Sequence, residues 1–400
     1  MKVVQINAVY GVASTGRIVK GINDLAAQEG IEAYAAYSQG RAEGENVFHF
    51  GSKREQKIHA LLSRITGLQG YFSKRGTREL LKKLDEIKPD VVHLHNLHSN
   101  NINLKTLLTY LAKNDIATVL TLHDCWFFTG KCCYFTMANC DNYQRVCGNC
   151  PNLKTDNKSL FFDRSSKMLL DKKKWFSKIP RLYVVGVSDW VTNLAKQSVV
   201  FPENTRFQTI YNGIDTEHFV PTESALKKEL GLENKFVALG LAMEISKRKG
   251  YDDFVALSNI LPEDVVLVLA GLSKEQIAAL PEGIIGLERT GDVKRLAEIY
   301  TMADVFVNPT HEDTFGLVNA EALACGTPVI VYRTGGCVEI VDESCGIIVE
   351  CNDVTGLKNA IAYVKENPFA AEDCGKRALN FKQEERYQEY VNLYREMAEK

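Results

Sequence analysis

Short apolar runs alternate along the chain with segments whose apolar residues recur every three or four positions. Nearly continuous runs of Val, Ile, Leu and Ala predict strands buried on both faces, and the periodic segments between them predict helices. In the first half, the predicted strands are Val3–Ile6, Ala33–Tyr37, Val91–Leu94, Ala117–Leu122 and Leu182–Val187. In the second half they are Phe236–Leu241, Val265–Ala270, Val305–Asn308, Pro328–Val331 and Gly346–Val349. This alternation predicts an α/β protein built on parallel sheets.

The strand pattern restarts near residue 235, after a stretch punctuated by Pro202, Asn212-Gly213 and Pro221. We therefore expect two doubly wound, Rossmann-like domains that face each other across a cleft. The predicted first domain is 1–205, with a Cys-rich insertion at 125–151, and the second is 206–383. A charged amphipathic helix over 384–400 is expected to pack back on the first domain.

Composition and charge narrow the function classes. With 45% hydrophobic and 24% charged residues, the 400-residue chain is globular rather than disordered. A net charge of -2 argues against a nucleic-acid-coating protein, so no nucleic acid partner is expected. The charge is uneven, because residues 1–200 hold 28 Lys and Arg against 17 Asp and Glu, and the remainder holds 20 against 33. The basic first half predicts contact with an anionic ligand or membrane surface.

The sequence also suggests a compartment. The apolar run after Met1-Lys2 is too short for a secretory signal, and no run approaches the roughly 18 apolar residues of a membrane span. An odd number of cysteines, eleven, is typical of reduced thiols. We expect a cytoplasmic protein, with peripheral association at the inner face of the cytoplasmic membrane as the further possibility.

Polar residues follow several predicted strands in the first half. The loop containing Gly16 opens a helix and suits an anion, although a tight strand-to-helix turn explains it equally well. His93 and His95 share one strand face, where core or turn histidines are more common than metal ligands. His123 ends a buried run beside Trp126-Phe127-Phe128, which makes it the strongest candidate for direct function.

The cysteine-rich insertion has two interpretations. Its pattern C-x7-C-x6-C-x2-C is formed by Cys132, Cys140, Cys147 and Cys150. A C-x-x-C pair with two further cysteines is able to hold a structural zinc, whereas buried thiols in an irregular loop are the simpler alternative. Cys125 and Cys133 complicate the count.

The second half carries the strongest signal. Lys247-Arg248-Lys249-Gly250 follows a predicted strand and suits a phosphate. In the segment 308–330, Asp313 lies in a loop and Glu321 lies eight residues later, nearly two turns into a helix expected to start near Phe315. Carboxylates at these places are good acceptors for sugar and ribose hydroxyls.

The segment 308–330, together with Tyr211–Asp215 and Thr334–Glu339, resembles the retaining glycosyltransferase family of sucrose synthases and phosphatidylinositol mannosyltransferases. Ser14–Ile18, His93–Asn96, Thr121–Asp124 and the Cys-rich loop resemble the subgroup that builds colanic-acid-like exopolysaccharides. The resemblance covers essentially the whole chain. It implies a GT-B type fold with the acceptor held mainly by the first domain and a nucleotide-sugar by the second.

The resemblance also implies roles for particular residues. Glu321 is expected to bind the ribose, Asp313 or the adjacent Glu312 the donor sugar, and Lys249 the diphosphate. His123 is expected to touch the sugar beside the attack site. The family's usual arginine falls on Met243 or Glu244, and Arg248 is the candidate to supply that charge. The other expected donor contacts are Gly16, Phe315, Gly316, Leu317, Gly335 and Gly336.

These expectations define a retaining, hexosyltransferase-type glycosyltransferase in polysaccharide biosynthesis that uses a front-face mechanism. No catalytic cofactor is expected, since family members need no metal and the chain has no D-x-D motif. The donor is a UDP- or GDP-sugar and the acceptor a glycan or a lipid-diphosphate-linked glycan. Candidate membrane contacts are Lys172–Phe176 and the cluster Lys74, Arg75, Arg78, Lys82 and Lys83. The alternatives are a non-catalytic nucleotide-sugar-binding protein or a nucleotide-sugar epimerase of the same architecture.

Overall fold

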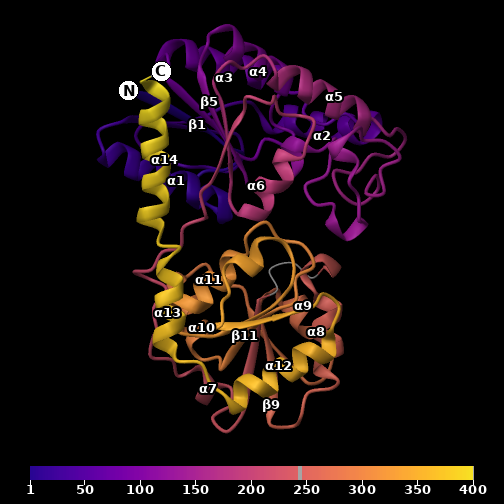
Figure 1. Cartoon of the computed structure of the whole chain (residues 1–400), viewed down its shortest axis with the longest axis vertical. Coiled ribbons are helices and arrows are strands. Elements are labelled where there is room, and N and C mark those ends of the chain that lie inside the picture. Colours follow the sequence, from indigo (N-terminus) through magenta and orange to yellow (C-terminus); the bar gives the residue numbers. More distant parts are fainter. Residues whose placement is uncertain (242–245, 400) are drawn as a thin grey trace. The chain divides into compact units, whose positions relative to one another are not determined.

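The chain consists of two compact α/β units. The computed structural model describes residues 1–241 and 246–399. The first unit comprises Met1–Tyr211 and Glu384–Lys400, and the second comprises Asn212–Gln383. Each unit has one parallel sheet with helices between its strands (Figure 1).

The first unit contains a seven-stranded sheet in the order β3-β2-β1-β4-β5-β6-β7. Its strands are β1 (Lys2–Ile6), β2 (Glu32–Tyr37), β3 (Val47–His49), β4 (Val91–Leu94), β5 (Ala117–Leu122), β6 (Leu182–Gly186) and β7 (Arg206–Thr209). Its helices are α1 (Ala13–Gln28), α2 (Lys53–Thr66), α3 (Lys74–Ile87), α4 (Leu104–Lys113), α5 (Ser165–Phe176), α6 (Asp189–Lys196) and α14 (Gln383–Ala398). The strand order reverses between β1 and β4, and open α/β sheets generally bind ligands at the carboxyl ends of the strands at such a point.

The second unit contains a six-stranded sheet in the order β10-β9-β8-β11-β12-β13. Its strands are β8 (Phe236–Leu241), β9 (Val265–Leu272), β10 (Ile284–Glu288), β11 (Val305–Asn308), β12 (Val329–Tyr332) and β13 (Gly346–Val349). Its helices are α7 (Leu226–Glu229), α8 (Tyr251–Ser258), α9 (Lys274–Ala278), α10 (Val293–Thr301), α11 (Leu317–Ala324), α12 (Val354–Glu366) and α13 (Ala371–Leu379). Here the order reverses between β8 and β11, so the general rule predicts a ligand site beyond those two strands.

All ten predicted strands are present, and the three strands missing from the prediction lie at sheet edges. β3 and β7 are the outer strands of the first sheet, and β10 is an outer strand of the second. Their side chains are mostly half-buried or exposed. These three edge strands lack the continuous apolar run by which the other strands are recognised, whereas β13, the remaining edge strand, has one.

The domain boundary lies between Tyr211 and Asn212 rather than after residue 205. The reason is β7, which pairs with β6 and so extends the first sheet beyond the expected boundary. The final helix, α14, returns to the first unit. Its Tyr394 hydroxyl lies 2.6 Å from Nδ1 of His93 on β4, and its Arg395 forms an ion pair with Glu29 after α1.

The buried contact between Tyr394 and His93 yields a stability prediction. Tyr394 is fully buried, so Tyr394→Phe removes a hydrogen-bonding partner of the His93 ring without opening a cavity. The free energy of unfolding of the first unit should fall by about 1–3 kcal/mol, measured by urea denaturation of the full chain. The matched control is Tyr363→Phe on α12, where the side chain is exposed. A loss below about 0.5 kcal/mol for Tyr394→Phe, within the range of surface substitutions, would contradict this interpretation.

Candidate active site

In the second unit, a basic turn follows β8. Lys247–Lys249 forms a single 3-10 turn that ends at Gly250, whose φ is +73°. A Cβ atom at Gly250 would overlap the carbonyl oxygen of Pro309, just after β11. This position requires glycine on both counts, because the left-handed φ and the close backbone approach each exclude a side chain.

Hydrogen bonds join the basic turn to the loop that follows β11. The amide of His311 donates to the carbonyl oxygen of Arg248 at 2.8 Å. In return, Nη1 of Arg248 donates to the carbonyl oxygen of Glu312 at 3.1 Å. Two loops separated by about sixty residues of sequence therefore form one rigid surface at the point where the strand order reverses.

Lys249 and Asp313 meet on this surface. Nζ of Lys249 lies 2.6 Å from Oδ2 of Asp313 in a largely buried ion pair. Burial by itself would raise the pKa of Asp313, but the ammonium of Lys249 holds that pKa below its ordinary value. The predicted diphosphate contact and the predicted sugar contact are therefore direct partners in the second unit.

The glycine pair Gly335-Gly336 completes this side of the site. The amide of Gly336 donates to the carbonyl oxygen of Asp313 at 3.2 Å. Gly335 has a φ of +54°, and a Cβ atom there would overlap the same carbonyl oxygen. The glycines bring the 3-10 turn Gly335–Glu339 against the Asp313 backbone, which no larger residue would allow.

Glu321 lies on α11, but less deep in the helix than predicted. α11 begins at Leu317, with Gly316 before it in the left-handed conformation, so Glu321 is little more than one turn from the N-terminus. The hydroxyl of Tyr300 donates to Oε2 of Glu321 at 2.9 Å. Burial and the nearby Glu321 carboxylate raise the pKa of Tyr300 well above its usual range, so the tyrosine remains a donor that orients this carboxylate.

The other predicted donor residues differ in accessibility. Phe315 is buried, with its ring against Phe381, so only its backbone is placed to meet a ligand. Glu312 is also buried. Leu317 is partly exposed at the start of α11. Met243 and Glu244, where the family's arginine would fall, lie outside the described residues.

A supporting network was missed by the sequence analysis. Asp253 on α8 receives His311 Nε2 at 2.7 Å on one carboxylate oxygen and the Tyr332 hydroxyl at 2.9 Å on the other. It thereby ties α8 and β12 to the loop that carries Asp313. No signal along the chain connects these residues, because they are about sixty to eighty positions apart.

In the first unit, His123 lies at the end of β5 as predicted by the strand pattern. Its Nε2 is 3.1 Å from Nδ1 of His95, whose Nε2 is 3.1 Å from Oε1 of Gln5. Burial lowers the pKa of His123 to about 4, so the ring is neutral at pH 7.

Gln5 determines which ring nitrogen of His95, and through it of His123, carries the proton. Its amide nitrogen donates to the carbonyl of Val19, so its oxygen faces His95 and accepts from it. His95 is then protonated on Nε2 and accepts at Nδ1 from the Nε2–H of His123. His123 is consequently an Nε2–H tautomer whose Nδ1 is an acceptor.

His93 lies against His95, with ring centroids 3.8 Å apart, but its hydrogen bonds go to other partners. Its two ring nitrogens meet the Tyr394 hydroxyl and Oγ1 of Thr121 at 2.6 and 2.7 Å. Both His93 and His95 are fully buried and surrounded by protein partners. They act as core histidines that hold β4 against its neighbours, in agreement with the more common of the two interpretations above.

Gly16 lies in the first turn of α1 and is buried. Its carbonyl accepts the amide of Gly11 at 2.8 Å, and a Cβ atom there would press on the side chain of Val9. These contacts give it a packing role at the strand-to-helix turn after β1, while its donor contact stays a prediction.

The predicted membrane contact at Lys172–Phe176 is wrong for most of its residues. Lys172, Trp175 and Phe176 are buried, and the ammonium of Lys172 donates to the carbonyl oxygens of Trp126 and Thr129. The cluster Lys74, Arg75, Arg78, Lys82 and Lys83 is exposed along α3. Among the described residues, none of the helices combines the length and apolar character that a membrane crossing needs.

Comparison with known proteins finds one matching family model for each unit. The family model Glycosyltransferase Family 4 matches residues 26–218, and the model Glycosyl transferases group 1 matches residues 223–381. A protein of Escherichia coli (strain K12) named as a colanic acid biosynthesis glycosyl transferase, WcaC, is 23% identical over 99% of this chain and 100% of its own length.

Solved structures match the whole chain at low identity. Sucrose-phosphate synthase from Thermosynechococcus elongatus has a TM-score of 0.73 at 17% identity, over 99% of this chain and 98% of that one. Anabaena HepE in complex with UDP and glucose has a TM-score of 0.65 at 16% identity, over 98% and 99% of the two chains. With a Family 4 domain followed by a group 1 domain on two Rossmann-like units, the chain belongs to the glycosyltransferases of GT-B fold.

Proposed function

We propose that this enzyme transfers a sugar, with retention of anomeric configuration, from a nucleotide-diphosphate sugar to a glycan or lipid-diphosphate-linked acceptor in polysaccharide biosynthesis. The observation that carries the proposal is the Lys249–Asp313 pair, with Glu321 on the adjoining α11, at the reversal point of the second sheet. The complex of HepE with UDP and glucose supports a nucleotide-sugar donor, and the likeness to WcaC supports a role in exopolysaccharide synthesis. UDP is the first base to test and GDP the second.

The donor would rearrange the ion pair on binding. Its diphosphate replaces Asp313 as the anionic partner of Lys249, and the released carboxylate accepts hydrogen bonds from the sugar hydroxyls. Arg248 and the amides near Gly335 and Gly336 add positive potential around the phosphates. Glu321, oriented by Tyr300, accepts from the ribose hydroxyls.

The chemical step in this proposal is a front-face displacement. The acceptor oxygen forms a bond to the anomeric carbon on the same side from which the nucleoside diphosphate leaves. As the bond from the anomeric carbon to the phosphate oxygen breaks, the departing oxygen takes the acceptor's proton. Lys249 stabilises the negative charge that develops on the diphosphate, and the step needs no metal ion.

His123 and the Gly16 turn would contribute from the first unit when the donor is bound. With an acceptor nitrogen at Nδ1, the neutral His123 ring receives a hydroxyl of the sugar rather than donating a proton to it. Its role is therefore positioning beside the reacting carbon.

Removal of the Lys249 ammonium tests the electrostatic part of the mechanism. Lys249→Ala should lower kcat for transfer by about 100-fold or more, because the leaving diphosphate loses its principal charge partner. Lys247→Ala, on the same turn but exposed, should change kcat less than about threefold. Transfer is measured with a panel of UDP- and GDP-sugars.

Three outcomes of that experiment reject the mechanism. Full transfer by Lys249→Ala would remove the proposed role of the ammonium. Donor binding by the unmodified chain, without transfer or hydrolysis of any sugar, would identify a nucleotide-sugar-binding protein instead. Interconversion of the donor sugar without transfer would identify an epimerase.

The ribose contact can be isolated with modified nucleotides. Calorimetric titration of the unmodified chain should show UDP binding about 10-fold or more tightly than 2′,3′-dideoxy-UDP, since the carboxylate of Glu321 is left without its hydroxyl partners. In Glu321→Ala the two nucleotides should bind equally, and Glu298→Ala on the neighbouring α10 should retain the preference. Equal affinities in the unmodified chain would place the ribose elsewhere.

Peripheral membrane association is part of the same proposal. The exposed face of α2 carries Ile58, Leu61 and Ile65, and Leu160–Phe162 is also exposed. The amide of Leu160 donates to the carbonyl of Arg64 at 2.7 Å, so this loop adjoins the end of α2. We call these six residues the α2 patch.

Basic residues accompany the α2 patch. Lys53, Arg54, Lys57 and Arg64 are exposed on the same helix. An apolar helix face with lysines and arginines beside it suits the interface of an anionic bilayer, where a lipid-linked acceptor would be found.

Liposome flotation tests this surface. The unmodified chain should float with vesicles containing anionic phosphatidylglycerol and much less with neutral vesicles. The double substitution Leu61→Ser with Phe161→Ser should reduce the floating fraction at least about threefold, because the two side chains lose their burial in the interface. Leu379→Ser, at an equally exposed position on α13, is the control. Equal flotation of all three proteins, or no lipid preference, would contradict membrane docking by the patch.

A further inference from the structure

The Cys-rich segment of the first unit is long and irregular, yet it is folded into the domain. Between the 3-10 turn Trp126–Phe128 and α5, residues 129–164 are all described and contain no α-helix or β-strand, only two short 3-10 turns. Irregular loops longer than about 12–15 residues are uncommon in compact domains. A segment of this length needs a local source of order.

Four cysteines of this segment line one cavity. Cys132, Cys140, Cys147 and Cys150 surround a space of about 20 Å³, together with Phe135 and Tyr143. That volume suits one ion or water-sized sphere, and the two aromatic rings make it a poor site for water. The Sγ atoms of Cys132 and Cys150 are 3.9 Å apart.

The Cys132–Cys150 spacing is that of two thiols in contact, and it is also compatible with two ligands of one metal ion but not with a disulfide. Four sulfurs around tetrahedral zinc at about 2.3 Å lie about 3.8 Å from one another, whereas a disulfide requires about 2.05 Å. No three of the four sulfurs lie within 4.8 Å of one another. Cys140 and Cys147, which are partly exposed, would therefore move inward to complete a tetrahedral set.

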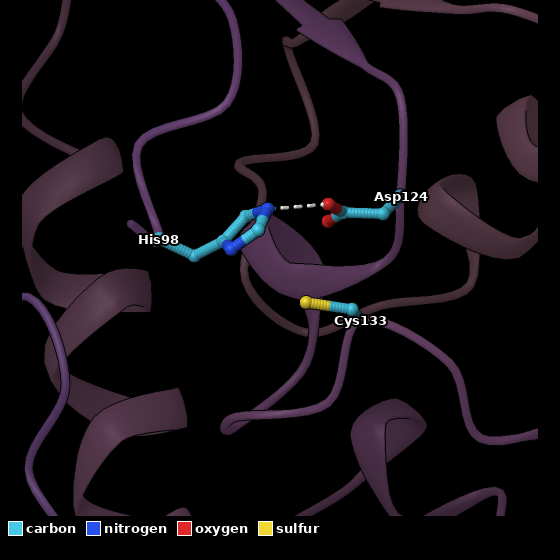
Figure 2. A group of neighbouring side chains, drawn as sticks. All are labelled: His98, Asp124 and Cys133. Atoms are coloured by element: carbon cyan, nitrogen blue, oxygen red, sulfur yellow. Dashed lines mark ion pairs between the residues drawn. The ribbon is translucent and has the colours of Figure 1, made fainter. Parts of the chain in front are cut away.

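The remaining cysteines of the segment face elsewhere. Figure 2 shows Cys133 beside His98 and Asp124, and its Sγ receives Nδ2 of Asn157 at 3.4 Å. His98 and Asp124 already form a buried ion pair of 2.8 Å, which accounts for that group without a metal. Neither Cys133 nor Cys125 lines the four-cysteine cavity. Of the six cysteines between positions 125 and 150, four therefore line the cavity and two do not.

Two buried lysines supply an independent argument based on charge. Lys131 and Lys172 are each only 2% exposed. Nζ of Lys131 donates to the backbone carbonyls of Asn152, Leu153 and Asp156, and Nζ of Lys172 donates to those of Trp126 and Thr129. Carbonyl oxygens solvate an ammonium but do not neutralise it, and a buried charge requires a counter-charge.

The thiols are placed to provide that counter-charge. Lys131 interacts electrostatically with Cys132 and Cys150, and Lys172 interacts with Cys147. Zinc bound by four thiolates carries a net charge of -2, which two ammonium groups would balance. Asp156 and Asp163 also act on Lys131, and Asp124 acts on Lys172, so the thiolates would share the counter-charge role with these carboxylates.

We propose that Cys132, Cys140, Cys147 and Cys150 bind one structural Zn²⁺ as thiolates, with Lys131 and Lys172 as its buried counter-charges. The ion orders residues 129–164 against the end of β5. Lys172 connects this site to the strand end, because it holds the Trp126 carbonyl while the Trp126 amide donates to Asp124 at 2.8 Å. This inference stands independently of the proposed transfer reaction.

Metal analysis of the full chain tests the proposal. Protein purified with a reductant and without chelator should contain about one zinc per chain by inductively coupled plasma mass spectrometry, and no stoichiometric iron. Cys147→Ser and Cys150→Ser should reduce the zinc content at least fivefold. Cys133→Ala in the same segment and Cys351→Ser in the second unit should retain it.

A spectroscopic readout identifies the ligands even if a variant folds poorly. Exchange of the unmodified chain with Co²⁺ should produce the visible d–d bands and near-ultraviolet charge-transfer bands of tetrahedral cobalt thiolate. Removal of the metal should expose residues 129–164 to limited proteolysis, and added Zn²⁺ should restore protection. Protein that binds neither ion, or whose intact mass shows disulfides among these cysteines, would overturn the proposal.

Two matched substitutions test the counter-charge role of Lys172. Lys172→Met should lose zinc to a competing chelator at about 10- to 100-fold lower chelator concentration, as expected for residues that support metal ligands. Lys173→Met changes the adjacent exposed lysine and should leave zinc retention unchanged. Equal retention by both variants would reject the role of Lys172.

Discussion

The close backbone approach of three loops, beyond β8, β11 and β12, is the constraint on which the proposed donor site depends. The approach is possible because Gly250 and Gly335 present no Cβ atoms to the carbonyls of Pro309 and Asp313. Reciprocal hydrogen bonds between Arg248 and residues 311–312 then hold the loops after β8 and β11 together. Lys249 and Asp313 then meet as a consequence of backbone geometry, before any ligand is considered.

Around that surface, polar groups orient one another rather than facing solvent. Tyr300 directs Glu321, and Asp253 joins His311 to Tyr332. The first unit uses the same strategy at the end of β5, where Gln5 fixes the tautomer of His95 and His95 fixes that of His123. Buried groups with satisfied partners are rigid, and rigidity is what an enzyme needs if it works by positioning and electrostatics.

The lysines of the first unit show that the number of basic residues does not predict which of them lie at the surface. The excess of basic residues in the first half indicates an anionic partner, but Lys131 and Lys172 are among the most buried side chains of the unit. Both ammonium groups donate hydrogen bonds to backbone carbonyls in the Cys-rich segment or just before it. The exposed basic residues lie instead along α2 and α3, where the α2 patch adds an apolar face.

The sequence by itself determined ten of the thirteen strands, the two Rossmann-like units, and the loops that carry Lys249, Asp313 and His123. It did so because strands buried on both faces require long apolar runs, and parallel sheets bring functional residues to the strand ends. Edge strands β3, β7 and β10 lack such runs and were missed. Only the tertiary structure decided which loops meet. The Lys249–Asp313 and Asp253–His311 pairs, the burial of Lys172, and the separation of Cys133 from the four-cysteine cavity depend on strand order and side-chain direction, which a one-dimensional pattern does not contain.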